Sequence, residues 1–517
     1  MQIHLRDSYY LRLFTAAVFI ILSLAGIAFA VYIMLVSSSI YVYFFGIFLL
    51  ALSVIAGFFN TVSAYFYYKS FFYDDYLGSI TRRLKPMRAY PTVAIGVPVK
   101  NENPAVVKRT INRLREMNYP KDRFNIYLLD DSTIREISAE LKAFCKKSRI
   151  SYLQRVSKTG FKAGNLNNML NNSREEFVAV FDYDEYLTNK NFLKDLMPYF
   201  QDERIGYIQT EKSSFKGNLL SDSVNLFDAF FFKFIQPARA FNNTAIFSGS
   251  CGVIRRRVLD EIGGFPEYVI EDTFFSFMSD MHDYKGLYIP KVYAYGEPVT
   301  TFSGLIKQQW RYNYGDTQFL MYFLNSKKGI KKKLSSQGSI EYISHGFGLN
   351  YLSVMLILFT ITSVMIVFSN LPFFHVGILK FISSANNNLI GLELFGMAAF
   401  ALSFFTPAIL TKVYFNSFKK GFMIFILNFS LAVVRTKAAL SALLRIDPAT
   451  QWARVVKGSS SNVLYALQKT KYEIGLAVVL FAFSALAALS NNIEGGLWLI
   501  FYGMLYLCAT LMVYRYG

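Results

Sequence analysis

The sequence predicts a water-soluble α/β domain, with a doubly wound mixed sheet, inserted between two groups of transmembrane helices. Of the 517 residues, 53% are hydrophobic, which is too apolar for an ordinary soluble enzyme. The apolar residues form long runs towards both ends of the chain, whereas the middle carries most of the acidic residues. In that middle, short β-branched runs alternate with helical patterns, as they do in doubly wound sheets.

The N-terminal part, residues 1–69, contains two apolar runs that we expect to form a transmembrane hairpin. The runs cover about 14–36 and 41–67, and each has the ~20 residues that a helix needs to cross a bilayer. The second run follows the first at once, which argues against a cleavable signal peptide. Basic residues flank both open ends of the hairpin and none lies in the link. Both ends are therefore expected in the cytoplasm.

The cytoplasmic domain is expected at residues 70–345. Five β-branched apolar runs are its expected strands: 93–99, 126–132, 150–156, 177–187 and 205–210. The second run ends on Asp130 and Asp131, and the fourth contains Asp182 and Asp184. Ligands bind beyond the carboxyl ends of strands in such sheets, so these acids predict a binding site there.

The run Asp182-Tyr183-Asp184 has the residue types of a divalent-cation site. Alternation along a strand would place both carboxylates on one side. Carboxylate oxygens suit a hard cation such as Mg²⁺ or Mn²⁺, which could neutralise a diphosphate. For this motif alone, a solvated turn is the alternative. The scattered cysteines and histidines form no zinc or disulfide pattern.

Three further stretches carry charged side chains that suit a phosphorylated substrate. Lys162 lies in GFKAGNLN, a Gly-bearing loop that opens a helix, where backbone N–H groups favour phosphate. Glu271 and Asp272 begin another helix, either as acids that complement the helix dipole or as a general base. KQQWRYNYGD, residues 307–316, lies on a third helix and could alternatively be an interfacial aromatic anchor.

The C-terminal part, residues 346–517, is expected to be a second transmembrane region. Its expected spans are about 349–369, 391–411, 472–490 and 495–514. The run at 420–445 has basic residues on both sides, so we interpret it as an interfacial helix. This gives six spans with both termini in the cytoplasm; seven spans with an external C-terminus is the alternative. The net charge of +19 then reflects basic helix ends that face anionic lipid, and nucleic acid is not an expected partner.

In chain order the motifs read Asp-Asp-Ser, Lys-Ala-Gly-Asn, Asp-x-Asp, Ser-Gly-Ser with Arg-Arg, Glu-Asp and Gln-x-x-Arg. This series, over about 90–315, resembles the processive, membrane-integrated members of glycosyltransferase family 2, such as cellulose synthase and hyaluronan synthase. The resemblance implies a GT-A-type fold and an inverting, metal-dependent enzyme of the plasma membrane. Such an enzyme would use a nucleotide-diphosphate sugar, with a UDP-sugar expected, to elongate and translocate a polysaccharide.

The resemblance also implies which side chains bind the donor. Asp130 or Asp131 would contact the base or the ribose, and Lys162 would meet the diphosphate. The remaining implied donor-binding residues are Asp182, Gln308 and Arg311. The implied ligands of Mg²⁺ or Mn²⁺ are Asp184 and Asp182, with Asp184 the more direct ligand.

For the acceptor, the resemblance implies Asp272 as the general base, with Glu271 beside it. The family motif ends Gln-x-x-Arg-Trp, but here position 312 is Tyr and a Trp stands at 310. Residues two apart on a helix do not share a face. We therefore expect Tyr312 to stack on the acceptor sugar and Trp310 to pack beneath it.

A loop at 446–462 is similar to the gating loop of cellulose synthases, which reads Phe-x-Val-Thr-x-Lys-Gly. In QWARVVKGSS the implied donor contacts are Trp452 and Lys457, although the Thr of the family motif is missing. A basic interfacial loop is the alternative for this segment.

Two other functions are compatible with the sequence. One is transfer of a single sugar to a lipid carrier or glycolipid by the same chemistry. The other is a transporter or scaffold with an inactive transferase domain. The intact acids argue against an inactive domain, and the spans carry almost no acidic residues, which argues against a proton-coupled carrier. The Gln-x-x-Arg motif and the six spans favour the polymer.

Overall fold

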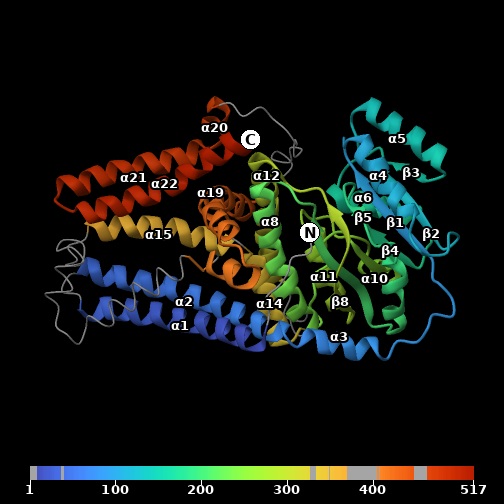
Figure 1. Cartoon of the computed structure of the whole chain (residues 1–517), viewed down its shortest axis with the longest axis horizontal. Coiled ribbons are helices and arrows are strands. Elements are labelled where there is room, and N and C mark those ends of the chain that lie inside the picture. The colour runs from blue at the N-terminus through green and yellow to red at the C-terminus, as the bar shows by residue number, and fades with distance from the viewer. Residues whose placement is uncertain are drawn as a thin grey trace.

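The computed structural model describes residues 8–36, 40–326, 334–348, 350–368, 405–406, 408–446 and 463–517. Long helices form one end of the molecule, a sheet covered by helices forms the other end, and a layer of helices lies between them (Figure 1). Most of the expected span at 391–411, and all but the first residue of the expected gating loop at 446–462, lie outside the described residues.

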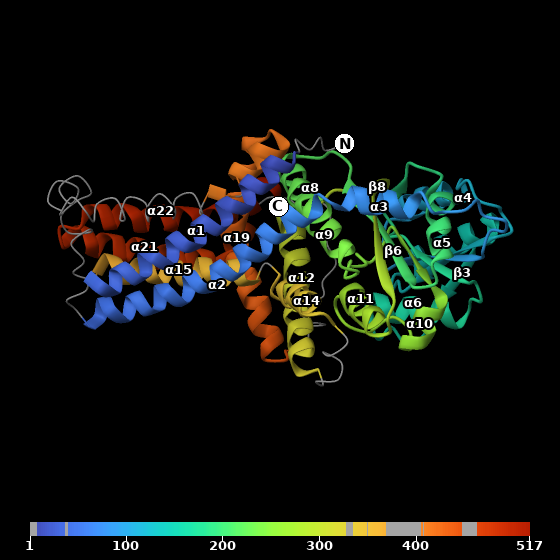
Figure 2. The ribbon, with the colours of Figure 1, turned by 90° about the horizontal axis from the view of Figure 1, so that it is seen from below.

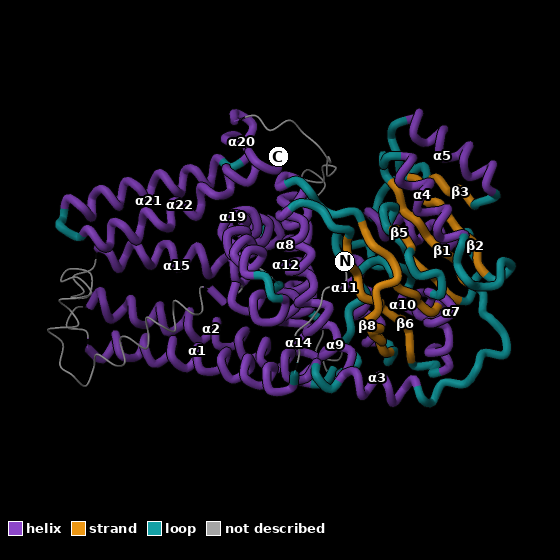
Figure 3. The backbone as a smooth tube through the Cα atoms, in the orientation of Figure 1, coloured by secondary structure: helices purple, strands orange, loops and turns teal. Residues whose placement is uncertain are grey.

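The sheet has eight strands in the order β3-β2-β1-β4-β7-β6-β8-β5 (Figure 3). The strands are β1 (Val93–Val99), β2 (Phe124–Asp130), β3 (Ser151–Gln154), β4 (Phe177–Val180), β5 (Tyr186–Leu187), β6 (Ile205–Ser214), β7 (Gly252–Arg255) and β8 (Lys285–Gly296). β3, β2, β1 and β4 are parallel, and β7 runs antiparallel to both β4 and β6. The sheet is therefore mixed, as expected.

Helices cover both faces of the sheet. One face packs against α4 (Pro104–Arg115), α5 (Arg135–Ser148) and α7 (Phe192–Leu196). The other face packs against α6 (Phe161–Asn171), α10 (Arg256–Ile262) and α11 (Glu271–Met281). Central strands covered on both sides need apolar residues at nearly every position, which explains the continuous run VAIGVPV in β1.

The expected strand at 177–187 is two strands separated by a turn. β4 ends at Val180, and Asp182, Tyr183 and Asp184 lie in the turn before β5. The alternation of a strand therefore does not apply to the two carboxylates, and that part of the prediction is wrong. The reason is tertiary: Phe181 is buried in the core, and its N–H is the last in this run to pair with β1, at the oxygen of Gly96.

Five long helices run along the long axis at the end remote from the sheet (Figures 1 and 2). They are α1 (Tyr9–Val36), α2 (Ile40–Ser70), α15 (Asn350–Phe368), α21 (Lys471–Leu489) and α22 (Ile493–Tyr516). Among the described residues, five helices are long and apolar enough to cross a membrane: α1, α2, α21, α22 and α19 (Phe418–Leu443). A sixth would be the bent pair of α14 (Ser336–Phe347) and α15.

α19 is the helix that the sequence predicts to be interfacial. It lies across the direction of the other long helices, nearly end-on in Figure 1 and steeply inclined in Figure 2. This crossing agrees with an interfacial helix, whereas the length and mean hydropathy of α19 also fit a span. Its interfacial position therefore stays a prediction.

α12 (Phe302–Asn325) connects the sheet domain to the long helices. It begins after Thr301, whose hydroxyl oxygen accepts a hydrogen bond of 3.1 Å from the N–H of Gly304. Phe302 and Leu305 pack with Leu427 and Leu431 of α19. The rest of the layer comprises α3 (Tyr73–Thr81), α8 (Leu219–Phe230), α9 (Gln236–Phe241) and α20 (Val463–Lys469). Residues 307–316 lie on a helix, as predicted.

Candidate active site

An ion pair between Lys162 and Asp182 lies at the centre of the candidate active site. Lys162 is the second residue of α6, which begins at Phe161; Phe161 and the preceding Gly160 both have positive φ. Its Nζ lies 2.7 Å from Oδ1 of Asp182 and donates a hydrogen bond of 2.9 Å to the carbonyl of Gly249. Oε1 of Glu271 is 3.9 Å away. The lysine thus joins three segments that are far apart in sequence.

The second oxygen of Asp182 contacts a second lysine. Oδ2 lies 3.4 Å from Nζ of Lys212 and 2.8 Å from the hydroxyl of Ser250. The backbone N–H of Asp182 donates to Oε2 of Glu185 at 2.8 Å. Burial alone would raise the pKa of Asp182, but Lys162 and Lys212 outweigh burial and hold it well below its ordinary value. Asp182 is therefore a permanent anion that orients two ammonium groups.

Glu271 and Asp272 form an acidic pair at the start of α11. Gly249 makes room for it: a Cβ on this residue, whose φ is +79°, would lie 3.2 Å from Oδ2 of Asp272. Oδ1 of Asp272 accepts a hydrogen bond of 2.8 Å from the N–H of Thr273. Burial raises the pKa of Glu271 to about 7, and burial also raises the pKa of Asp272. These raised values suit groups that accept a proton near neutral pH.

Helix α12 lies against this acidic pair. A Cβ on Gly315 would lie 2.5 Å from Cγ2 of Ile270, so the helix approaches closely the residue before Glu271. Nearby, the guanidinium carbon of Arg311 lies 5.2 Å from the centre of the Tyr312 ring. Both side chains are exposed. The packing therefore holds an exposed cation and an exposed ring beside the two acids.

Tyr312 and Trp310 lie on different faces of α12, as predicted. Tyr312 is 40% exposed, and its hydroxyl accepts a hydrogen bond of 3.3 Å from Nε2 of Gln308. Trp310 is 8% exposed and stacks on Tyr314 with ring centres 5.1 Å apart. Val269, Ala438 and Ala442 complete this apolar cluster. Of the two rings, Tyr312 is the one with a surface available to a sugar.

The two acids at the end of β2 are held by side chains of the protein. Asp130 accepts hydrogen bonds from the N–H of Ser132 at 2.8 Å and from the hydroxyl of Tyr152 at 2.7 Å. Asp131 accepts two from Arg155, at 2.9 and 2.7 Å. Arg155 also donates to the carbonyl of Phe161 at 2.9 Å. These contacts tie the end of β2 to the helix that carries Lys162.

The turn that carries Asp182 and Asp184 suits a divalent cation that is completed by substrate. Among the described residues, no group of three or more His, Cys, Asp or Glu side chains could hold a metal ion. The segment between β4 and β5 carries three carboxylates: Asp182 contacts two lysines, Glu185 contacts Lys212 and Ser250, and Asp184 is the third. Mg²⁺ commonly binds one or two carboxylates together with substrate phosphates. The carboxylates of this turn therefore fit a cation that a bound diphosphate would complete.

Sequence reasoning missed Lys212, Ser250 and Arg155. Lys212 follows the buried part of β6, so a charge at the end of a predicted strand could have indicated it. Ser250 belongs to the Ser-Gly-Ser motif, but nothing in the sequence pairs it with Asp182. Trp452 and Lys457 lie outside the described residues.

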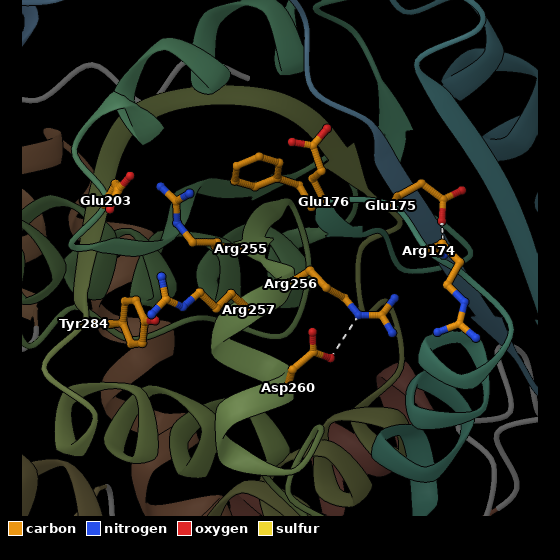
Figure 4. A pocket seen from close by; sticks show the side chains of 10 residues that line it. Arg174, Glu175, Glu176, Glu203, Arg255, Arg256, Arg257, Asp260 and Tyr284 are labelled. Atoms are coloured by element: carbon orange, nitrogen blue, oxygen red, sulfur yellow. Dashed lines mark hydrogen bonds and ion pairs between the residues drawn. The ribbon is translucent and has the colours of Figure 1, made fainter.

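A hollow with several charged residues lies at the opposite end of the same strands (Figure 4). It adjoins Phe177, where β4 begins, and Arg255, where β7 ends. Its arginines bind neighbouring groups: Nη2 of Arg255 donates to the carbonyl of Phe200 at 2.7 Å, and Nε of Arg256 lies 3.1 Å from Oδ1 of Asp260. These charges support the fold, and the predicted site residues lie elsewhere.

Comparisons with known proteins agree with this arrangement. Residues 94–263 match the family model "Glycosyl transferase family 2". The chain is 31% identical over 237 residues to the UDP-forming cellulose synthase catalytic subunit of Pseudomonas fluorescens strain SBW25, and 28% identical over 258 residues to that of Xanthomonas axonopodis pv. citri strain 306. The aligned regions are 44% and 48% of this chain, but 31% and 35% of the relatives, so the chain spans about a third of their length.

A mannosyltransferase from Pyrobaculum calidifontis, in complex with GDP-Man and Mn²⁺, superposes with a TM-score of 0.48 at 15% identity, over 75% of this chain and 99% of that one. Together with the mixed sheet, the family match confirms the expected GT-A-type domain and the resemblance to cellulose synthases.

Proposed function

Because residues 94–263 carry a glycosyltransferase family 2 domain, we propose that this chain is an inverting membrane glycosyltransferase. It takes a sugar from a nucleotide-diphosphate sugar, with UDP as the nucleotide, and elongates a polysaccharide that it also translocates. The observation that carries the proposal is one cluster. Lys162 and Asp182 lie together with the Glu271–Asp272 pair, next to the exposed Arg311 and Tyr312 of α12.

The donor diphosphate binds between α6 and α12. Lys162 and Arg311 supply positive charge to its oxygens, and the amide of Gln308 donates a hydrogen bond. Asp184 would hold Mg²⁺ or Mn²⁺, which when bound would supply positive charge to the leaving diphosphate. Asp182 keeps Lys162 in place and oriented, because their ion pair of 2.7 Å is partly buried. Asp130 and Asp131 lie at the nucleotide side of the sheet.

Asp272 removes the proton from the acceptor hydroxyl during transfer. The hydroxyl oxygen attacks the anomeric carbon while the bond from that carbon to the diphosphate oxygen breaks, and UDP leaves with the bonding electrons. The proton ends on Oδ2 of Asp272. One in-line displacement inverts the anomeric centre. The raised pKa of the acidic pair supports this role, because a carboxylate of higher pKa is a stronger base.

The proposed location is the plasma membrane, with the sheet domain and both termini in the cytoplasm. The candidate spans support a multi-pass protein, and the basic helix ends support this orientation. The acceptor is the growing polysaccharide, which leaves between the membrane helices. The similarity to UDP-forming cellulose synthase catalytic subunits supports both the donor and the polymer.

Incubating the purified chain in lipid nanodiscs with radiolabelled UDP-sugars tests the proposal. We expect a product of high mass that a glycosidase specific for the incorporated sugar degrades. A discrete labelled lipid would instead establish single-sugar transfer. If no nucleotide sugar is turned over by the folded protein, the enzyme assignment fails and a scaffold role replaces it.

A further inference from the structure

Lys212 is a second lysine of the candidate active site that the proposed function leaves without a role. It lies near the end of β6, and its Nζ is 3.4 Å from Oδ2 of Asp182 and 3.3 Å from Oε1 of Glu185. The Ser250 hydroxyl is 2.5 Å away. The Lys212 side chain is 27% exposed. Three oxygens therefore hold the ammonium group of a side chain that is still partly open to solvent.

The two lysines lie on opposite sides of Asp182. Lys162 takes Oδ1 and extends towards Glu271, whereas Lys212 takes Oδ2. Burial lowers the pKa of Lys212, but the charge of Glu185 and smaller contributions, including one from Tyr312, raise it overall. Tyr312 is therefore close enough to interact with Lys212. Lys162 thus lies on the side of the base, and Lys212 lies on the side of the exposed ring.

A carboxylate on α8 borders the same space. Asp228 is exposed, and within the described ranges no hydrogen bond or ion pair reaches it. Asn225, one turn earlier on α8, accepts a hydrogen bond of 3.3 Å from the N–H of Ser214, which fixes this helix against the end of β6. Although the residue is exposed, desolvation of its carboxylate by the surrounding protein raises the pKa of Asp228 to about 6, and the Lys212 charge opposes that rise. Asp228 therefore lies near Lys212.

We propose that Lys212 and Asp228 bind the terminal sugar of the acceptor, whose ring stacks on Tyr312. This inference rests on the proposed function, because it needs a sugar acceptor in the cleft. Lys212 donates to a ring or hydroxyl oxygen of that sugar, and Asp228 accepts from one of its hydroxyl groups. An aromatic platform with one charged donor and one charged acceptor at its edge gives both stacking and hydrogen bonding to a hydroxylated ring.

Two features assign Lys212 to the acceptor rather than to the donor diphosphate. Its charge is already offset by Asp182 and Glu185, so it contributes a hydrogen-bond donor more than a net attraction for phosphate. Tyr312 and Asp228 belong to α12 and α8, which pack against α19 with the apolar residues of one cluster. The acceptor approaches from that side, whereas the nucleotide lies over β1 to β3.

The pair also selects the class of sugar. Asp228 is an anion at neutral pH, since that is above its pKa of about 6. A uronate in the same place would bring a second carboxylate beside it, which like-charge repulsion disfavours. We therefore expect a neutral terminal sugar with free hydroxyl groups.

The experiment uses the full chain in lipid nanodiscs, the UDP-sugar that the wild-type protein incorporates and an oligosaccharide of the same sugar as acceptor. Lys212→Met and Asp228→Asn should each raise the acceptor KM about 10- to 100-fold, the loss expected for a hydrogen bond to a charged group. As the acceptor KM rises, the ratio of sugar transfer to donor hydrolysis should fall. The affinity for UDP should stay within about twofold of that of the wild type.

Lys233→Met is the matched control. Lys233 pairs with Glu211 at 2.7 Å, one residue before Lys212, but it makes no contact with Asp182 or Ser250 in the described structure. It should leave the acceptor KM unchanged. If Lys212→Met fails to fold, Asp228→Asn carries the test, because nothing described in the fold binds this carboxylate.

Two results would overturn the inference. An unchanged acceptor KM in both variants removes Lys212 and Asp228 from the acceptor site. A fall in UDP affinity that matches the loss of transfer assigns Lys212 to the donor instead. A wild-type protein that transfers no sugar defeats the proposed function itself, so the two failures are distinguishable.

Discussion

Nε of Arg435 donates a hydrogen bond of 2.9 Å to Oε1 of Gln309, which joins α19 to the helix that carries the predicted Gln-x-x-Arg motif. Arg435 is 3% exposed, and a second hydrogen bond of 3.1 Å goes to Oδ1 of Asn428. Both partners are neutral amides, and across the described ranges no carboxylate pairs with this cation. The position of α12 against α19 thus depends on a buried charge with few partners.

Replacing Gln309, the hydrogen-bond partner, should lower the free energy of unfolding more than replacing the charged Arg435 itself. Gln309→Leu leaves the buried guanidinium without its acceptor, and we expect a loss of about 1.5–3 kcal/mol in the free energy of unfolding. Arg435→Met deletes the charge and its desolvation penalty, so we expect a much smaller loss. Thermal melting of both variants in lipid measures the difference. Equal destabilisation would contradict the role assigned to Gln309.

Asp272→Asn should abolish transfer while donor binding persists. The amide cannot take the proton from the acceptor hydroxyl, so we expect kcat to fall by about 10²- to 10⁴-fold. UDP affinity, measured by calorimetry, should remain close to that of the wild type because the diphosphate contacts are elsewhere. Turnover near the wild-type rate would reject Asp272 as the base.

The activity should depend on pH through the Glu271–Asp272 pair. Burial raises the pKa of Glu271 to about 7, with repulsion from Asp272 adding to the rise, so the pair takes up a proton as the pH falls through this value. A proton shared by the pair lowers the fraction of Asp272 that is ionised and able to act as the base, so kcat/KM should fall on the acid side. Glu271→Gln removes a negative charge beside Asp272 and should shift this acid limb to lower pH. If the acid limb of the pH profile does not shift in Glu271→Gln, the charge of Glu271 does not affect the protonation of Asp272.

Tyr312→Ala should impair acceptor binding, whereas Trp310→Ala should impair stability. Loss of the exposed Tyr312 ring removes the acceptor platform, so we expect an acceptor KM about tenfold higher with UDP affinity unchanged. Trp310 is buried against Tyr314, and its truncation should cost about 3–5 kcal/mol of stability. Acceptor kinetics and melting curves of both variants distinguish these effects. The reverse pattern would make Trp310 the platform.

Asp184→Ala should remove the metal dependence of donor binding. In the wild type we expect Mg²⁺ or Mn²⁺ to strengthen UDP binding and EDTA to reverse the effect. In Asp184→Ala, UDP should bind equally weakly with and without metal. Asp182→Asn provides the contrast, because it releases Lys162 and Lys212 and should weaken UDP binding under both conditions. Persistent metal-dependent binding in Asp184→Ala would reject this ligand.

Much of the sheet could be predicted from sequence because its buried strands are continuous apolar runs. β1 and the start of β6 lie where the pattern predicts them. β2 lies two residues earlier than predicted, and β3 starts one residue later and ends two residues earlier than predicted. β7 and β8 were not predicted. β7 has four residues, and β8 interrupts its apolar pattern with Pro290 and Lys291, so neither carries a clear period.

The sequence predicted those site residues whose side chains have a recognisable chemical role in a motif. Lys162 lies near Asp182 and Glu271, and α12 packs closely against the residue before Glu271, so these motifs lie near one another; their roles stay predictions. Lys212, Ser250 and Arg155 could not be predicted, because their contacts with Asp182 and Asp131 join residues from 24 to 68 positions apart. Such pairings leave no periodic signal.

The sequence by itself determined the class of the protein: apolar runs around an α/β domain, with acids at strand ends and a Gln-x-x-Arg motif on a helix. These features follow from local composition and spacing, which the hydrophobic effect and helix geometry translate directly into structure. Tertiary structure alone decided that Asp182 holds two lysines and that Asp182 and Asp184 share a turn. Those outcomes depend on packing between distant segments, and the energy of each contact exists only after the chain has folded.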